Sequence, residues 1–171
     1  MDDDGAAVPA GTPGEIRSRG PELFAGYTDP ALTAGAFDPD GWYRTGDIGR
    51  IDDDGWLTIT DRKSDIIIRG GENISAVEVE TLLLGLPGVA EVALVAAPDA
   101  RLGEHACAFI RMVGPETETP SLEAVRTHLR DAGLSKQKWP EEIRAADDLP
   151  RTPTGKVKKH ELRHLLRTRP D

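Results

Sequence analysis

Residues 66–88 read IIIRGGENISAVEVETLLLGLPG, and this stretch decides the fold of the larger part of the chain. The apolar run at residues 66–68 precedes Gly70-Gly71 and Asn73-Ile74 follows them, which predicts a hairpin because paired glycines adopt the positive φ of a tight turn. Ser75 and Glu78 then form the pattern of a capping box, in which a hydroxyl and a carboxylate satisfy free backbone amides. A helix is therefore expected from residue 76 to about residue 86.

Strands and helices follow this stretch in a regular order. Residues 89–97 and 105–113 are apolar and predict two strands joined through Pro98-Asp99. Ser121 is placed to cap a helix that runs to about residue 133, and a last helix is expected near residues 158–167. From residue 66 onward the order is hairpin, helix, two strands, helix, short strand, helix. This is the pattern of an α+β domain of about 100 residues.

The first 60 residues have a different character. Residues 15–19 alternate polar and apolar side chains as a strand does, and residues 20–42 contain too many Pro and Gly residues for a long element. The strand-like segments 43–52 and 56–61 flank the sequence DDDG at residues 52–55, a strong hairpin turn. Large apolar residues are scarce, so this region is expected to pack on something else, with a boundary near residues 61–65.

The composition narrows the class of protein. The 171 residues are 38% hydrophobic and 30% charged, and no apolar run approaches the roughly 20 residues that span a bilayer. An acidic N-terminus is the opposite of a secretory signal, and a single cysteine cannot form an internal disulfide, so a reducing cytoplasm is expected. The single cysteine, Cys107, lies in an apolar run and is interpreted as a core residue rather than a nucleophile.

The net charge of −9 is unevenly distributed. Residues 1–60 carry 12 acidic and 4 basic side chains, whereas residues 150–171 carry 7 basic and 2 acidic ones. A basic end on an acidic chain is often only a solvated helix face, but it also suits a small phosphorylated ligand. Nucleic acid is disfavoured, because the basic patch is short and has no interleaved aromatic residues.

Residues 150–156, PRTPTGK, form a Pro-, Thr- and Gly-rich turn that presents Lys156 just before the last helix. A lysine on such a turn can be carried to an anion as a point charge. The alternative is a solvated surface lysine beside Lys158 and Lys159.

Four motifs occur in one order: YRTGD at 43–47, DRKSD at 61–65, RGGENI at 69–74 and PRTPTGK at 150–156. With them the chain, from about residue 14 to 167, resembles the C-terminal portion of the adenylate-forming acyl-CoA synthetases of the AMP-binding enzyme superfamily. The resemblance implies an α+β lid domain at residues 63–171, with a three-stranded sheet, a hairpin and flanking helices. Residues 1–62 would be the β-rich end of the large N-terminal domain.

The resemblance also implies roles for individual residues. Lys156 is similar to the catalytic lysine of the family, which stabilises charge while an acid attacks the α-phosphate of ATP. Asp47 is similar to the residue that accepts hydrogen bonds from the ribose hydroxyls, and Arg62 to an arginine that reaches the nucleotide. From the residues alone, Asp47 could equally form a turn, and Arg62 a surface ion pair.

Two further sets of residues follow from the resemblance. Ser64 stands at the hinge about which the lid rotates, where Asp or Lys is usual, and the neighbouring Lys63 can share that role. Gly70 and Gly71 line the tunnel that admits the pantetheine arm of CoA, while Arg69 contacts a CoA phosphate. The glycines can also serve the hairpin turn alone.

The expected function is that of an ATP-dependent carboxylic acid–CoA ligase for fatty or medium-chain acids, which forms an acyl-adenylate and then an acyl-CoA thioester. ATP, CoA and Mg²⁺ are expected, with the Mg²⁺ site outside this chain. No Ser/Thr/Gly-rich phosphate loop precedes the motifs, so we expect a truncated chain that lacks its N-terminal AMP-binding domain and is inactive alone. The alternative is a non-catalytic CoA- or nucleotide-binding module, or a lid subunit that pairs with a separate AMP-binding domain.

Overall fold

The computed structural model describes residues 1, 2 and 4–168, and it divides into two compact units. Unit 1 is Met1–Ser64 and unit 2 begins at Asp65. The division predicted between residues 62 and 63 lies two residues away. The elements of unit 1 are β1 (Gly14–Ser18), α1 (Pro30–Ala36), β2 (Tyr43–Ile51) and β3 (Leu57–Arg62), and the short 3₁₀ helix η1 (Lys63–Asp65) follows them.

Unit 1 is built on an antiparallel sheet in the order β1-β2-β3. The predicted hairpin at residues 52–55 is confirmed: the Asp52 amide donates to the Trp56 carbonyl at 3.1 Å, and Gly55 has a φ of +86°. The Asp52 carboxylate accepts from the amides of Asp54 and Trp56. An aspartate at the first position thus fixes the turn that sets the β2–β3 register.

Helix α1 lies in residues 20–42, where no long element was expected, and it has only seven residues. Asp29 caps it by accepting a hydrogen bond from the Ala31 amide at 2.8 Å, and Pro30 stands in its first turn. Asp followed by Pro is a helix-start signal, and it outweighs the glycine at position 35 over these seven residues.

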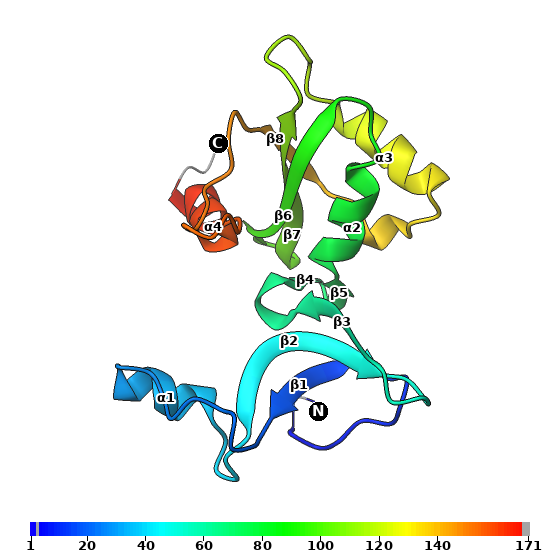
Figure 1. Ribbon diagram of the computed structural model, residues 1–171. Coiled ribbons are helices and arrows are strands. Elements are labelled where there is room, and N and C mark those ends of the chain that lie inside the picture. Colours follow the sequence, from blue (N-terminus) through cyan, green and yellow to red (C-terminus); the bar gives the residue numbers. More distant parts are fainter. Residues whose placement is uncertain (3, 169–171) are drawn as a thin grey trace. The chain divides into compact units, whose positions relative to one another are not determined.

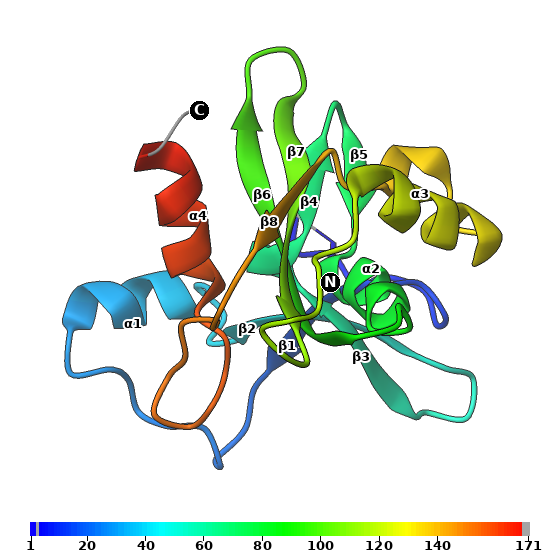
Figure 2. The same cartoon turned by 90° about the horizontal axis from the view of Figure 1, so that it is seen from above.

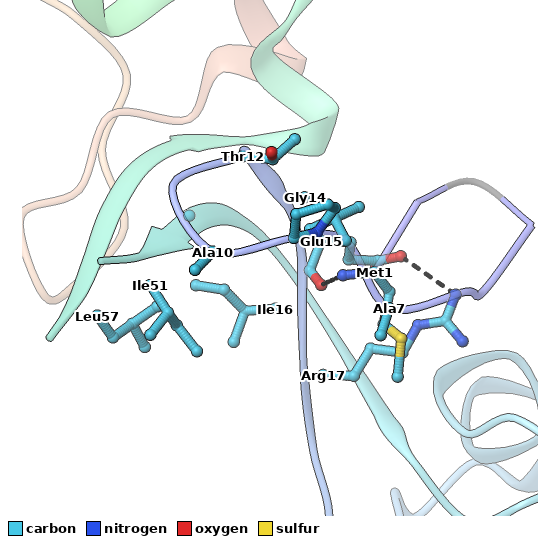
Figure 3. A pocket seen from close by; sticks show the side chains of 13 residues that line it. Met1, Ala7, Ala10, Thr12, Gly14, Glu15, Ile16, Arg17, Ile51 and Leu57 are labelled. Carbon is cyan, nitrogen blue, oxygen red and sulfur yellow. Dashed lines mark hydrogen bonds and ion pairs between the residues drawn. The ribbon is translucent and has the colours of Figure 1, made fainter. Parts of the chain in front are cut away.

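A hollow of about 470 Å³ lies beside β1 in unit 1. Figure 3 shows the side chains of Ile16, Ile51 and Leu57 near one another on one side of it, and the Met1 ammonium donates to the Glu15 carbonyl at 3.0 Å. Apolar residues near the β2–β3 turn stay exposed, with Trp56 in the turn at 74% and Ile59 of β3 at 62%. This sheet therefore leaves part of its apolar surface uncovered within the unit.

Unit 2 is an α+β domain, as predicted. Its elements are β4 (Ile67–Arg69), β5 (Glu72–Ile74), α2 (Ala76–Leu83), β6 (Val89–Asp99), β7 (Gly103–Met112), α3 (Leu122–Asp131), the 3₁₀ helix η2 (Lys136–Lys138), β8 (Glu142–Ala145) and α4 (Lys159–Thr168). Strands β6 and β7 pair antiparallel and β8 pairs parallel with β7. The β4–β5 hairpin joins this three-stranded core through the pair Arg69↔Gly103.

Both faces of the unit 2 sheet are covered. Figures 1 and 2 show α2 and α3 on one face and α4 on the other. Side chains alternate along β6, so Leu94 packs under α2 and α3 whereas Ala93 and Val95 pack under α4. A strand buried on both faces is apolar at successive positions, which explains the continuous apolar runs in the sequence.

The predicted hairpin and helix cap of residues 66–86 are confirmed. Gly70 and Gly71 have φ values of +56° and +89°, and the Ser75 side chain accepts from the Glu78 amide at 3.1 Å. Helix α2 ends at Leu83 rather than near residue 86, because the amides of Gly85 and Leu86 bond to carbonyls three residues back and tighten the chain into a turn.

Cys107 is fully buried on β7 in the face that α4 covers, so its interpretation as a core residue is confirmed. Burial raises the pKa of its thiol and disfavours the thiolate.

Candidate functional site

Lys156 is exposed on a tight turn between β8 and α4 of unit 2. The turn is closed by its own backbone: the Thr152 amide donates to the Lys156 carbonyl at 2.8 Å, and the Gly155 amide donates to the Thr152 carbonyl at 2.9 Å. Gly155 has a φ of +86°, which a residue with a Cβ rarely adopts. The Lys156 amide donates to the Thr152 hydroxyl at 3.1 Å. The motif residues therefore hold the backbone and leave the ammonium to solvent.

Arg151 braces the base of this turn. One guanidinium nitrogen donates to the Gly155 carbonyl at 2.7 Å, and the other forms a close ion pair with Glu91 of β6. The second oxygen of Glu91 accepts from Arg111 of β7 at 2.7 Å, and this contact raises the pKa of Arg111. The turn is thus tied to two strands of the sheet.

Asp47 and Arg62, which were predicted to bind the nucleotide, lie together in unit 1. They face each other across β2 and β3, with Arg62 Nε 3.4 Å from Asp47 Oδ1, and both remain partly exposed to solvent. The Asp47 amide donates to the Thr45 hydroxyl, which in turn donates to the Ile16 carbonyl of β1. A carboxylate and a guanidinium thus stand side by side on a braced strand, where they can meet hydroxyl and phosphate groups.

A β-bulge brings this pair together. The hairpin register pairs Ile51 with Leu57 and Gly49 with Ile59, and it shifts by one residue between Ile48 and Gly49. Without the shift, Asp47 would face Asp61 instead of Arg62. Bulges re-aim side chains in this way and are frequent beside active sites.

The predicted hinge residues lie in η1, and the division between the two compact units falls directly after Ser64. Lys63 Nζ is 3.6 Å from Glu15 Oε2 within unit 1. The Glu15 side chain is buried and is also 3.7 Å from Arg17. Lys63 is therefore anchored to β1 of its own unit.

On the other side of the division, Asp65 is tied to helix α4. Its two carboxylate oxygens lie 3.2 Å from Arg163 Nη1 and 3.8 Å from Lys159 Nζ. Lys159 also reaches Glu80 of α2 at 2.8 Å, and burial raises the pKa of Glu80. The first residue of unit 2 is thus coupled to the helix that follows the Lys156 turn.

Arg69 ends β4, and Gly70 and Gly71 form the turn between β4 and β5. The Arg69 guanidinium forms a close ion pair with Glu141, whose other oxygen accepts from the Ala106 amide at 3.1 Å. Arg69 therefore also holds the hairpin to the sheet. A Cβ on Gly71 would meet no atom within 4 Å, so the outer side of the turn is open.

Glu15 and Glu141 contact the predicted site residues Lys63 and Arg69, Glu91 contacts Arg151 of the Lys156 turn, and all three were missed in the sequence. Each is part of no motif, and the Glu91–Arg151 pair spans 60 positions, so the sequence carries no local signal for it. The Asp47–Arg62 contact did have a signal, because the hairpin turn at 52–55 places the two segments opposite each other.

In the described part of the chain, no group of three or more His, Cys, Asp or Glu side chains is arranged to hold a metal ion. None of the described helices is long and apolar enough to cross a membrane.

Comparison with known proteins gives the class of this domain. Residues 78–156 match the model of the AMP-binding enzyme C-terminal domain. The crystal structure of ATP-bound MatB from Rhodopseudomonas palustris superposes with a TM-score of 0.85 at 35% sequence identity, covering 96% of this chain and 32% of that one. The chain therefore belongs to the AMP-binding, adenylate-forming enzymes and corresponds to their C-terminal part.

Its curated relatives include acid–CoA ligases. The medium-chain fatty-acid–CoA ligase of Escherichia coli (strain K12) is 46% identical over 164 residues, which are 95% of this chain and 29% of that enzyme. A salicylyl-CoA synthase/salicylate adenylyltransferase of Streptomyces sp is 47% identical over 165 residues, 96% of this chain and 30% of that protein. The chain thus spans about 30% of the length of these two relatives.

Proposed function

We propose that this chain supplies the lid of an ATP-dependent carboxylic acid–CoA ligase, together with the end of its large AMP-binding domain. The observation that carries the proposal is Lys156, an exposed ammonium on a turn whose backbone is closed on itself and braced to the sheet. The names of the relatives support the two substrates: MatB has been crystallised with ATP, and the E. coli relative is a CoA ligase.

In the first half-reaction the carboxylate of the acid attacks the α-phosphate of ATP, and pyrophosphate leaves. Negative charge builds up on the entering carboxylate and on the phosphoryl oxygens, and the Lys156 ammonium stabilises both. Asp47 accepts hydrogen bonds from the ribose hydroxyls, and the adjacent Arg62 faces the nucleotide. Mg²⁺ would accompany ATP, and we assign its site to the AMP-binding domain that this chain does not cover.

In the second half-reaction the thiol of CoA attacks the acyl carbonyl, and AMP leaves. We assign Ser64 and Lys63 to the hinge that moves Lys156 away before this step. The anchoring of Lys63 to Glu15 on one side, and of Asp65 to α4 on the other, supports a pivot confined to these residues. The open side of Gly71 supports a passage for the pantetheine arm beside Gly70-Gly71, with Arg69 at its edge.

The proposed acid is a fatty or medium-chain carboxylic acid, because the E. coli relative acts on such acids by name. The residues that would select the acid belong to the part of that relative that this chain does not cover. We place the enzyme in the cytoplasm, since Cys107 is the sole cysteine and is buried, which suits a reducing compartment.

A chimera tests this function. The matched C-terminal portion of the E. coli medium-chain fatty-acid–CoA ligase is replaced by this chain, and acid-dependent pyrophosphate release is measured. We expect the chimera to be active and the Lys156→Ala chimera to lose about 100-fold or more in adenylation rate. The 171-residue chain alone should release none. Acid-dependent pyrophosphate release by the chain alone, or full activity of the Lys156→Ala chimera, would contradict the proposal.

A further inference from the structure

The turn that bears Lys156 does not by itself fix the position of the lysine ammonium relative to the rest of unit 2. A lysine side chain is long and flexible, so its ammonium can be aimed only if the backbone that bears it is held. The hydrogen bonds between Thr152 and Lys156 fix the shape of the turn, but they do not connect it to the rest of unit 2. The connection must come from the residues at its base.

Arg151 makes that connection with both branches of its guanidinium. Nη1 donates to the carbonyl of Gly155, the residue directly before Lys156, at 2.7 Å. Nη2 pairs with Glu91 Oε2 on β6. One planar, rigid group therefore joins the peptide that precedes the lysine to the sheet.

Glu91 is itself fixed from the opposite side. Glu91 and Arg111 are register partners on β6 and β7, and Arg111 Nη2 donates to Glu91 Oε1 at 2.7 Å. The carboxylate therefore lies between two guanidinium groups, and about 30% of each of the three side chains is exposed. Partial burial and two-sided pairing make this contact stronger than an isolated surface ion pair.

We propose that Glu91 is a positioning residue for Lys156: through Arg151 it fixes the base of the turn and so aims the ammonium. The function of the aimed lysine rests on the role proposed above, but the structural part of the inference does not. If Glu91 loses its charge, Arg111 and Arg151 confront each other as like charges, and Arg151 is expected to leave the turn.

Amide hydrogen exchange on the full 171-residue chain tests the structural part. In Glu91→Gln, we expect the Gly155 and Lys156 amides to exchange about tenfold faster or more, because the turn opens more often. The matched control is Glu78→Gln, which removes one charge from another partly exposed ion pair of unit 2, that with Lys138 at 2.7 Å. Unchanged exchange at both amides in Glu91→Gln, or an equal rise in Glu78→Gln, overturns the inference.

The two half-reactions of the chimera test the functional part. We expect Glu91→Gln to lower the rate of adenylation about 10- to 100-fold, with the KM for ATP and the rate of thioester formation from supplied acyl-adenylate unchanged. A residue needed only for folding would lower both rates together. Arg151→Lys keeps the charge but loses the two-branched contact, so it should lie between the wild type and Glu91→Gln.

Two controls separate the possible failures. If Lys156→Ala leaves adenylation intact, the proposed function fails, whatever Glu91 does. If Lys156→Ala abolishes adenylation and Glu91→Gln leaves it intact, only the positioning role is overturned. Should Glu91→Gln fail to fold, Arg151→Lys carries the test alone: a selective loss of adenylation supports the inference, and wild-type rates refute it.

Discussion

Units 1 and 2 are both built around antiparallel strands, yet they bury different kinds of side chain. Among the described residues, every buried hydrophobic side chain lies at or after Ile67, in unit 2. In the described part of unit 1 the buried polar residues are Glu15 and Asp61, the Arg17 side chain beside Glu15 is 8% exposed, and the apolar Ile51, Leu57 and Ile59 of β2 and β3 stay exposed. Unit 2 is therefore stabilised by two apolar layers, whereas unit 1 is held by turns, polar pairs and a partly exposed cluster of the aromatic rings of Phe24, Tyr27, Phe37 and Tyr43.

The predicted site residues are distributed over these two differently stabilised units. Lys156 and the Gly70-Gly71 turn belong to the unit with its own core, which can move as a rigid body. Asp47 and Arg62 belong to unit 1, which has exposed apolar residues of the kind that another protein surface usually covers. A lid that moves and a nucleotide platform that stays with a larger body would divide the residues in this way.

The largest expected effect on stability comes from deleting a core side chain in unit 2. Leu94 is fully buried between the sheet and helices α2 and α3, so Leu94→Ala should lower the free energy of unfolding of unit 2 by about 2–5 kcal/mol. The matched change in unit 1 is Ile59→Ala, where 62% of the side chain is exposed, and it should change stability by about 0.5 kcal/mol or less. Urea titrations of the three chains measure both values. Equal losses would show that unit 1 also has an apolar core.

Removing a helix cap should also affect stability more in unit 2 than in unit 1, but by less than removing a core side chain. Ser75 caps α2, which packs on the sheet, so Ser75→Ala should cost unit 2 about 1 kcal/mol. Asp29 caps α1, which has no buried residue. Asp29→Ala should therefore fray α1 locally, seen as faster amide exchange at residues 31–33, and leave the unfolding of unit 2 unchanged. A shift in the unfolding transition of unit 2 caused by Asp29→Ala would contradict the claim that this cap stabilises only α1.

The smallest expected effect is a pH dependence confined to unit 1. The Trp42 amide, and then the Arg17 guanidinium, lower the pKa of Asp38 below its ordinary value of 3.8. The charged form is favoured in the folded state, so its contribution is present above that value and is lost as the pH falls through the lowered pKa. The Trp42 amide should lose protection below about pH 4, after correction for the intrinsic exchange rate.

Asp38→Asn provides the control for this pH dependence. It should show weaker protection of the Trp42 amide near neutral pH, and no further loss on acidification attributable to residue 38. An acid-induced loss as large as that of the wild type in this variant would assign the effect to another group.

Most of the fold could be predicted because its signals are local. The Asp-Gly and Gly-Gly turns, the Ser75 cap and the apolar runs of β6 and β7 each depend on neighbouring residues, and the structure confirms them. The short helix α1 was not predicted because Pro30 was counted among the breakers of residues 20–42, although a proline after Asp29 can begin a helix. The end of α2 was misplaced because apolar spacing continues into the turn that follows Leu83.

The candidate site was harder to predict from the sequence, because its contacts connect residues that are far apart along the chain. The motifs indicated Asp47, Arg62 and Lys156, but not the bulge that turns Asp47 toward Arg62. The ion pairs of Glu91 with Arg151 and of Glu141 with Arg69 depend on which strands become neighbours, and no spacing rule gives that.

The rates of the two half-reactions, measured separately in the chimera, give the most direct test of the different roles proposed for the two units. The account predicts that Lys156→Ala slows adenylation about 100- to 1,000-fold and leaves thioester formation from supplied acyl-adenylate unchanged. Asp47→Ala should weaken both half-reactions, because both use the bound nucleotide. Equal loss of the two half-reactions in Lys156→Ala would contradict the claim that unit 2 brings its lysine to the first step alone.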